Sequence, residues 1–139
     1  MNEKPILVDN KADTKVIIMA AWIALMCLYI YCDILSLFKP GQLSSMLNGR
    51  MGPFEVSSMG IFWAGLLMVI PSLMIPVSIL TGASVGRIIN LIISPVYLLV
   101  NIGNLIGEEW GYYILFGSLE IGVVIFIFLI SLRWPRQGS

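Results

Sequence analysis

Apolar residues dominate four long stretches of the chain, and polar residues recur inside them at helical spacing. The stretches cover about residues 16–38, 57–80, 86–106 and 111–132. Each has the roughly 20 residues that a helix needs to cross the hydrocarbon core of a bilayer. Only helices or closed barrels can cross, and these stretches lack the alternation of barrel strands. We therefore predict an all-α fold, a four-transmembrane-helix bundle in which residues 1–139 form a single membrane domain.

The third stretch carries a stripe of polar residues. Their spacing of 4, 3, 4 and 3 positions keeps all of them on one face of a helix. Polar groups that face lipid are costly, so we expect this face to point into the bundle. The stripe consists of Asn90, Ser94, Tyr97, Asn101 and Asn104.

Two carboxylates, Asp33 and Glu120, lie in stretches that contain no basic residue. An ionised carboxylate at the centre of a membrane helix costs roughly 2.5–3.5 kcal/mol on insertion scales. At about 1.5 Å per residue, Glu120 lies near mid-membrane and Asp33 lies in the outer third. We expect Glu120 to be mostly protonated and hydrogen-bonded across the bundle. For Asp33 an ionised form that approaches Lys39 stays open.

These residues together predict a polar column that runs from one mouth of the bundle to its middle. Tyr29 shares a helix face with Asp33, and the asparagines of the third stretch fall at intermediate depths. The alternative is that these side chains only hold helices together through hydrogen bonds worth about 0.6–2 kcal/mol each. The candidate proton- or cation-binding residues are Glu120, Asp33, Asn101, Asn104, Tyr97 and Tyr29.

Three prolines interrupt the second and third stretches: Pro71, Pro76 and Pro95. A proline inside a helix cannot donate to the carbonyl four residues earlier and usually bends the helix. Transporters use carbonyls freed in this way to bind ions, whereas fixed bends that only shape the bundle are the alternative. The freed carbonyls are those of Leu67, Ser72 and Leu91.

Two pairs of small residues, Ser118 with Gly122 and Gly60 with Ala64, are typical of close helix contacts or self-association.

Residues 39–56 form the longest connection. In it, the spacing of Leu43, Met46 and Leu47 predicts a short amphipathic helix over 42–49, which Gly49 ends. We expect this helix to lie on the extracytoplasmic membrane surface, either packed on the bundle mouth or as a mobile lid.

We expect a protein of the bacterial inner membrane with both termini in the cytoplasm, because the side of the membrane that holds the termini carries most of the basic residues. These are Lys4, Lys11, Lys15, Arg87, Arg133 and Arg136.

The composition supports a membrane protein and narrows its chemistry. Of 139 residues, 58% are hydrophobic and only 12% are charged, against about a quarter in soluble domains. Eight basic and eight acidic residues balance, so nothing suggests nucleic-acid binding. The chain has no histidine, which removes the commonest metal ligand and acid–base catalyst. We expect no cofactor, no metal site and no enzyme activity.

Several segments resemble one family of small bacterial four-helix membrane proteins of unknown function. They are YIYCDILSLFKPG at 29–41, NGRMGP at 48–53, IPSLMI at 70–75 and YYILFGSLEIG at 112–122. The resemblance covers nearly the whole chain and includes both carboxylates. It implies an integral membrane protein with four helices and implies no activity.

Three functional hypotheses remain open from the sequence. The first is a small proton- or cation-coupled transporter or channel, with Glu120 as the group that binds the proton or cation. The second is a non-catalytic membrane subunit or scaffold that binds a lipid or a protein partner. A homo-oligomer stays open under the first hypothesis. A membrane enzyme that acts on a lipid comes third, because a carboxylate would have to act alone.

Overall fold

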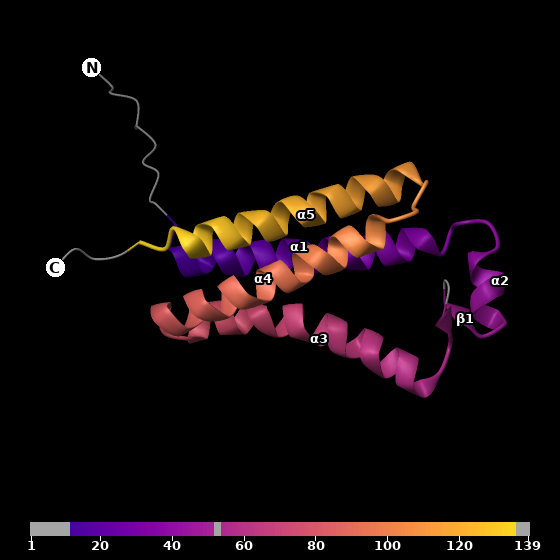
Figure 1. Cartoon of the computed structure of the whole chain (residues 1–139), viewed down its shortest axis with the longest axis horizontal. Helices are drawn as coiled ribbons and strands as arrows, with labels where there is room; N and C mark the ends of the chain where they lie inside the picture. The colour runs from indigo at the N-terminus through magenta and orange to yellow at the C-terminus, as the bar shows by residue number, and fades with distance from the viewer. Residues whose placement is uncertain (1–11, 52–53, 136–139) are drawn as a thin grey trace, which may run out of the picture.

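The computed structural model describes residues 12–51 and 54–135, and four long helices make up most of it (Figure 1). They are α1 (Thr14–Ser36), α3 (Ser58–Leu80), α4 (Ala83–Leu105) and α5 (Gly111–Leu132). Each is long and apolar enough to cross a membrane. The predicted all-α bundle with four membrane-spanning helices is confirmed, with boundaries that differ from the predicted ones by up to three residues.

Side-chain caps set the first residues of α1 and α3. Residue Asp13 accepts a hydrogen bond from the backbone N of Lys15 at 2.7 Å, so α1 begins at Thr14, two residues earlier than predicted. The side chain of Ser57 accepts from the backbone N of Gly60 at 3.0 Å and starts α3 in the same way. The cap at Asp13 thus lengthens α1, whereas α4 begins at Ala83, three residues earlier than predicted, without a side-chain cap.

A short helix and a minimal strand pair connect α1 to α3. Helix α2 (Gln42–Leu47) follows Gly41, whose φ of 81° is easily adopted only by glycine. The predicted helix at 42–49 is thus present but ends at Leu47. Strands β1 (Arg50–Met51) and β2 (Phe54–Glu55) pair antiparallel, a feature that the sequence pattern did not predict. The connection between the two strands, Gly52 and Pro53, lies outside the described residues.

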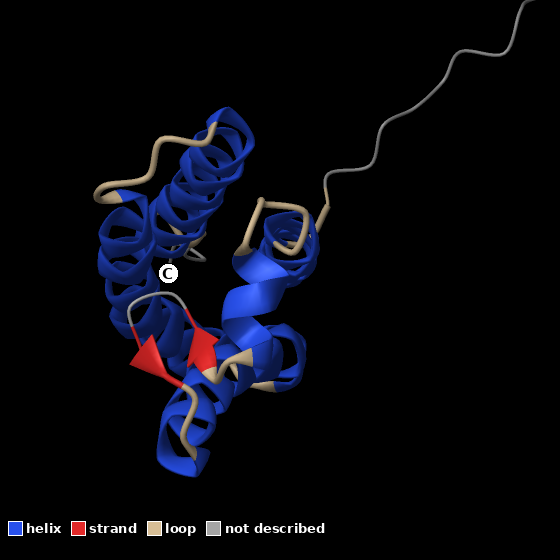
Figure 2. Ribbon diagram, turned by 90° about the vertical axis from the view of Figure 1, so that its right-hand side faces the viewer, coloured by secondary structure: helices blue, strands red, loops and turns tan. Residues whose placement is uncertain are grey.

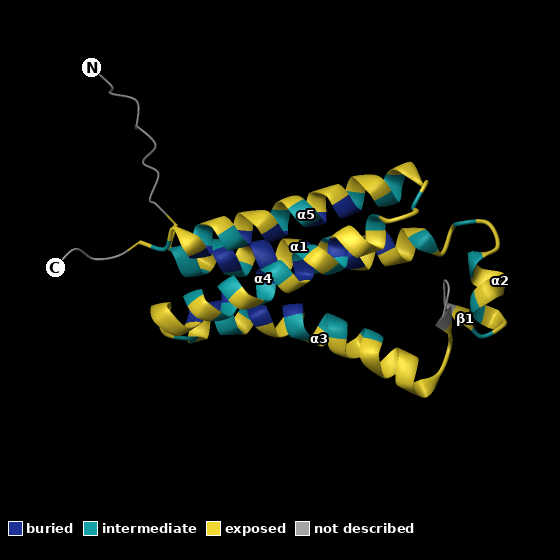
Figure 3. Cartoon of the chain, viewed as in Figure 1, coloured by how far each residue is buried: buried dark blue, intermediate teal, exposed yellow. Residues whose placement is uncertain are grey.

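The four long helices surround a core in which α5 packs on both α1 and α4, whereas α3 packs mainly on α1 (Figure 2). Here "α2 end" denotes the end of the bundle that carries α2, and "far end" denotes the end where α1 begins. Helices α3 and α4 meet at the far end, and α3 bends away from the others toward the α2 end (Figure 1). The buried residues accordingly lie on the inner sides of α1, α4 and α5, while the half of α3 nearer α2 is largely exposed (Figure 3).

Side chains tie the helices together across the bundle. In the centre, Trp22 and Tyr97 pack edge to face with ring centroids 6.1 Å apart. At the far end, Lys15 Nζ donates to the carbonyl of Thr81 at 2.5 Å, which caps the end of α3. Arg87 Nε donates to the carbonyl of Ser131 at 3.1 Å and does the same for α5. The far end is therefore closed by charged hydrogen bonds from α1 to α3 and from α4 to α5.

Candidate functional site

The far half of the polar stripe on α4 is fully engaged in structural hydrogen bonds. Asn90 accepts from Trp22 Nε1 at 2.8 Å, and its own Nδ2 donates to the carbonyl of Gly86 at 2.8 Å. The hydroxyl of Ser94 donates to the backbone carbonyl of Asn90. Both side chains are fully buried. Asn90 therefore links α1 to α4, and both the oxygen and the nitrogen of its amide are bonded within the protein.

The hydroxyl of Tyr97 supplies a hydrogen-bond donor to a backbone carbonyl that a proline leaves unpaired. Pro71 leaves the carbonyl of Leu67 without its helical N–H, and Tyr97 Oη donates to that carbonyl at 2.5 Å. This bond joins α4 to α3. Tyr97 is 1% exposed and Leu67 is half-buried, so the bond lies at the edge of the buried core.

Asn101 is bonded on one side only. Tyr29 Oη donates to Asn101 Oδ1 at 2.7 Å, a second link between α1 and α4. Asn101 is fully buried, and its Nδ2 has no hydrogen-bond partner among the described residues. A buried amide N–H without a partner costs free energy, so this group is available to a water or a ligand oxygen.

A polar cavity of about 40 Å³ opens beside these residues, between α1, α4 and α5, with Met68 of α3 on its wall. A cavity of about 10–15 Å³ can hold one water, so there is room here for water or a small cation. Its polar lining comes from three tyrosines, two carboxylates, an asparagine and a thiol. The lining residues are Tyr29, Cys32, Asp33, Met68, Tyr97, Val100, Asn104, Tyr113 and Glu120.

Glu120 is the most deeply placed acidic group on this wall. It is 5% exposed, and its Oε1 has no hydrogen-bond partner within residues 12–51 and 54–135. It lies nine residues into α5, which is about 13.5 Å along the helix. The expected hydrogen bond of Glu120 across the bundle is therefore not made by Oε1. An unpaired carboxyl oxygen in a polar cavity is a group that can accept a proton, a water or a cation.

Asp33 and Asn104 connect the cavity to the molecular surface. Both residues are exposed, yet both line the cavity wall with Glu120. Asp33 lies three residues before the end of α1, which places it about 4.5 Å from the helix end and near the membrane boundary. Lys39 does not approach it as an ion-pair partner. Because α1 ends at Ser36, the chain turns and Lys39 pairs with another carboxylate.

That carboxylate is Glu108, in the connection between α4 and α5. Lys39 Nζ donates to Glu108 Oε2 at 2.8 Å, and both side chains are only 17% exposed. Burial alone would lower the pKa of Lys39, but the hydrogen bond and charge of Glu108 outweigh burial and raise it. Burial alone would raise the pKa of Glu108, but the hydrogen bond from Lys39, backbone N–H groups and the charge of Lys39 hold it below its usual value. The pair fastens the end of α1 to the start of α5.

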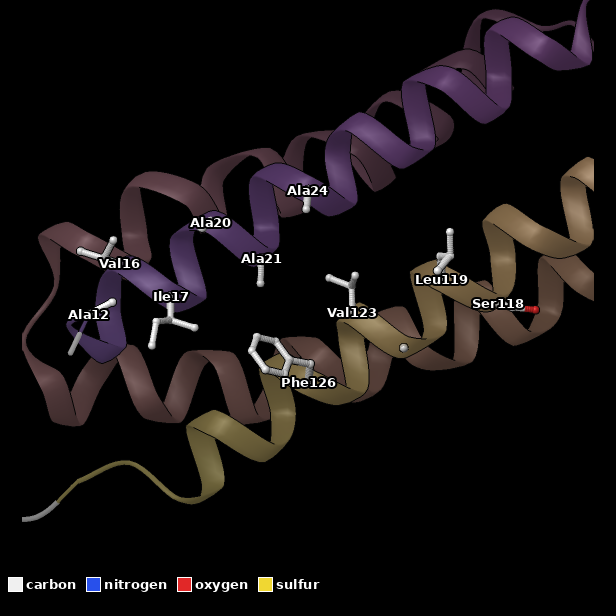
Figure 4. Close-up of a pocket in the computed structure, with 11 residues that line it drawn as sticks. Ala12, Val16, Ile17, Ala20, Ala21, Ala24, Ser118, Leu119, Val123 and Phe126 are labelled. Atoms are coloured by element: carbon white, nitrogen blue, oxygen red, sulfur yellow. The ribbon is translucent and has the colours of Figure 1, made fainter. Parts of the chain in front are cut away.

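A larger apolar groove lies on another side of the bundle, between α1 and α5 (Figure 4). Its volume is about 600 Å³, and small side chains on both helices leave it open. It includes the small-residue pair Ser118 and Gly122 that the sequence marks for close contact. In Figure 4 the groove is bordered by Val16, Ile17, Ala20, Ala21 and Ala24 on α1 and by Leu119, Val123 and Phe126 on α5.

Five of the six predicted site residues thus lie around one cavity: Glu120, Asp33, Asn104, Tyr97 and Tyr29. The sixth, Asn101, is bonded to Tyr29 beside it. Sequence reasoning did not select Tyr113 or Cys32 for the site, although both line the wall. Tyr113 is seven residues before Glu120, on the same face of α5, and this spacing could have indicated it. Within residues 12–51 and 54–135, no group of three or more Cys, Asp or Glu side chains is placed to hold a metal ion.

Four apolar helices around a mainly hydrophobic core with a small polar cavity define an integral membrane protein with four membrane-spanning helices. The chain belongs to a protein family of unknown function, DUF6326, whose sequence profile matches residues 6–139. The resemblance to an uncharacterised family of small four-helix membrane proteins is confirmed. No curated protein and no solved structure matches the chain.

Proposed function

We propose that this protein is a small proton- or cation-coupled transporter or channel in which Glu120 binds the coupling ion. One observation carries the proposal: a buried carboxyl group with an oxygen left unpaired by the described residues lines a polar cavity. A side chain that only joined helices would be expected to spend its hydrogen bonds on them, as Asn90 does. Ionisable groups inside membrane helices mark ion pathways and proton relays more often than they mark simple packing.

The geometry favours entry from the α2 end. Asp33 is exposed and lies about 9 Å nearer its helix end than Glu120 does, so it can attract a cation to the mouth. From there, Asn104 and the tyrosine hydroxyls offer oxygens along the cavity wall to Glu120. Beyond Glu120, the Trp22–Asn90 bond and buried aliphatic side chains close the bundle. Release at the far end would therefore require a rearrangement, as in alternating access.

In this proposal the protein lies in the cell inner membrane, with both termini in the cytoplasm. The cavity then faces the extracytoplasmic side. The basic residues near the far end, Lys15 and Arg87 among them, support this orientation by the positive-inside rule.

The test is ion flux in proteoliposomes that hold a pH-sensitive dye, with imposed pH, Na⁺ and K⁺ gradients. Glu120→Gln keeps the shape of the side chain but removes the titratable group, and we expect it to abolish flux. Glu109→Gln is the matched control, because Glu109 is an exposed carboxylate outside the spans and should leave flux unchanged. The proposal is wrong if the wild-type protein carries no flux in any gradient, or if Glu120→Gln matches it in all of them.

A second candidate function rests on the groove between α1 and α5. In this reading the protein is a non-catalytic membrane subunit, and the groove of about 600 Å³ holds the acyl chain of a membrane lipid. Gly122→Leu would fill the groove, because a Cβ at Gly122 meets no atom within 4 Å. Native mass spectrometry in mild detergent should then show bound lipid in the wild-type protein and its loss in the variant. Equal lipid retention in both would exclude the groove as the binding site.

A further inference from the structure

Lys39 lies inside a cage of three aromatic rings. Its Nζ is 5.6 Å from the ring centroid of Trp110, 5.6 Å from that of Tyr112 and 4.9 Å from that of Tyr113. All three distances fall within the roughly 6 Å over which a ring face attracts a cation. Glu108 supplies a carboxylate at 2.8 Å. A single ion pair would suffice to fasten two helices, so the three rings need a further explanation.

The cage is held in place by bonds that do not involve Lys39. Glu108 Oε1 accepts from the backbone N of Trp110 at 3.1 Å, which fixes the carboxylate. The rings support one another edge to face, with centroids 6.3 Å apart for Trp110 and Tyr112 and 6.1 Å apart for Tyr112 and Tyr113. The hydroxyl of Tyr112 also lies 3.0 Å from Ser36 Oγ. The cage can therefore keep its shape when the lysine side chain leaves it.

Lys39 itself is the easiest member to displace. It lies in the connection after α1 and holds its ammonium on a flexible four-carbon stem. A primary ammonium is strongly hydrated, and burial between aromatic rings removes much of that hydration. A quaternary ammonium loses less hydration and is the cation for which aromatic cages are best known.

We propose that Trp110, Tyr112, Tyr113 and Glu108 form a binding site for a small organic ammonium ion, and that Lys39 is a tethered occupant which such an ion displaces. This site does not depend on the proposed transport function, because Glu120 is not one of the residues that form the cage. It does share Tyr113 with the polar cavity, so a ligand in the cage lies next to the wall that carries Asp33. The cage would then select an organic cation at the mouth of that cavity.

Binding is tested with tetramethylammonium chloride, by calorimetric titration of the purified protein against an equal concentration of NaCl. We expect Lys39→Met, which keeps the stem but removes the charge, to tighten binding about tenfold or more because no internal cation competes. Trp110→Leu and Glu108→Gln should weaken it by a similar factor. The matched controls are Trp63→Leu, an exposed tryptophan in α3, and Glu109→Gln, and both should bind as the wild type does.

A second measurement uses the unmodified protein and so does not depend on how a variant folds. Acetylation of Lys39 by an amine-reactive reagent, followed by mass spectrometry, should increase severalfold in tetramethylammonium and stay constant in NaCl. Lys15, which donates to carbonyls at the far end, is the internal control and should not change. The proposal is overturned if Lys39 labelling is constant at every tetramethylammonium concentration, or if Lys39→Met folds and binds no more tightly than wild type. Glu120→Gln should bind tetramethylammonium normally, which separates this test from the flux test.

Discussion

Replacing Tyr97 with phenylalanine removes the hydroxyl that donates to the carbonyl of Leu67, and nothing else in the side chain. That carbonyl has lost its helical donor to Pro71, so the substitution leaves it unpaired inside the bundle. An unsatisfied buried group costs about 1–3 kcal/mol, and hydrogen bonds between membrane helices are worth about 0.6–2 kcal/mol. We therefore expect Tyr97→Phe to lower the free energy of unfolding by about 1–2 kcal/mol.

The decisive comparison is the same substitution in a Pro71→Ala background. Alanine restores a backbone N–H that can bond the carbonyl of Leu67, so the loss of the tyrosine hydroxyl should then cost little. The double-mutant cycle should show a coupling of about 1 kcal/mol between the two positions. Unfolding free energies can be measured in mixed micelles, with Tyr31→Phe as the control because Tyr31 is 61% exposed on α1. If Tyr97→Phe lowered the unfolding free energy equally in both backgrounds, Tyr97 would not be the donor that replaces the helical bond to the carbonyl of Leu67.

Three other substitutions have expected outcomes from packing and charge. Gly117→Ala should destabilise the α4–α5 contact by about 1–3 kcal/mol, since its Cβ would lie 2.5 Å from Leu105 Cδ2, and Leu105→Ala should rescue it in thermal melts. Trp22→Phe should lower the unfolding free energy by about 0.6–2 kcal/mol through loss of the bond to α4, and an unchanged value would contradict that role. The lowered pKa of Glu108 means that its pairing with Lys39 stabilises the fold above the ordinary carboxyl pKa of 4.5, and that this stability disappears as the pH falls through the lowered value. The wild-type protein should thus melt at a higher temperature than Glu108→Gln at neutral pH, and this difference should disappear in acid. A difference that stayed constant with pH would exclude the ion pair as its cause.

The helices and the inward polar face could be predicted because both depend on periodicity. A stripe spaced 4, 3, 4 and 3 residues has only one face to occupy on a helix, and lipid excludes the outward one. In the structure Asn90, Ser94, Tyr97 and Asn101 are buried, and Asn104 lies at the exposed edge of the cavity. The depths of Asp33 and Glu120 followed from the rise per residue in the same way.

The partners of the side chains could not be predicted, because they depend on how connections run and on which helices become neighbours. The chain turns after Ser36, so Lys39 reaches Glu108, 69 positions away, rather than Asp33. The freed carbonyl of Leu67 was evident from Pro71, but its donor comes from a different helix. Trp22 was not selected either, although it lies seven residues from Tyr29 on one face of α1, the spacing that lets both reach α4.

The central claim is that Glu120 exchanges a proton or cation through the polar cavity and is not sealed in the bundle. Infrared difference spectroscopy of the reconstituted protein tests this most directly, with Glu120→Gln used to assign the carboxyl C=O band. We expect a band, missing in the variant, that shifts promptly in D₂O and changes in intensity with pH while the protein stays folded. A Glu120 band that neither shifts in D₂O nor responds to pH would mean that the carboxyl group is isolated from water, and would contradict the claim.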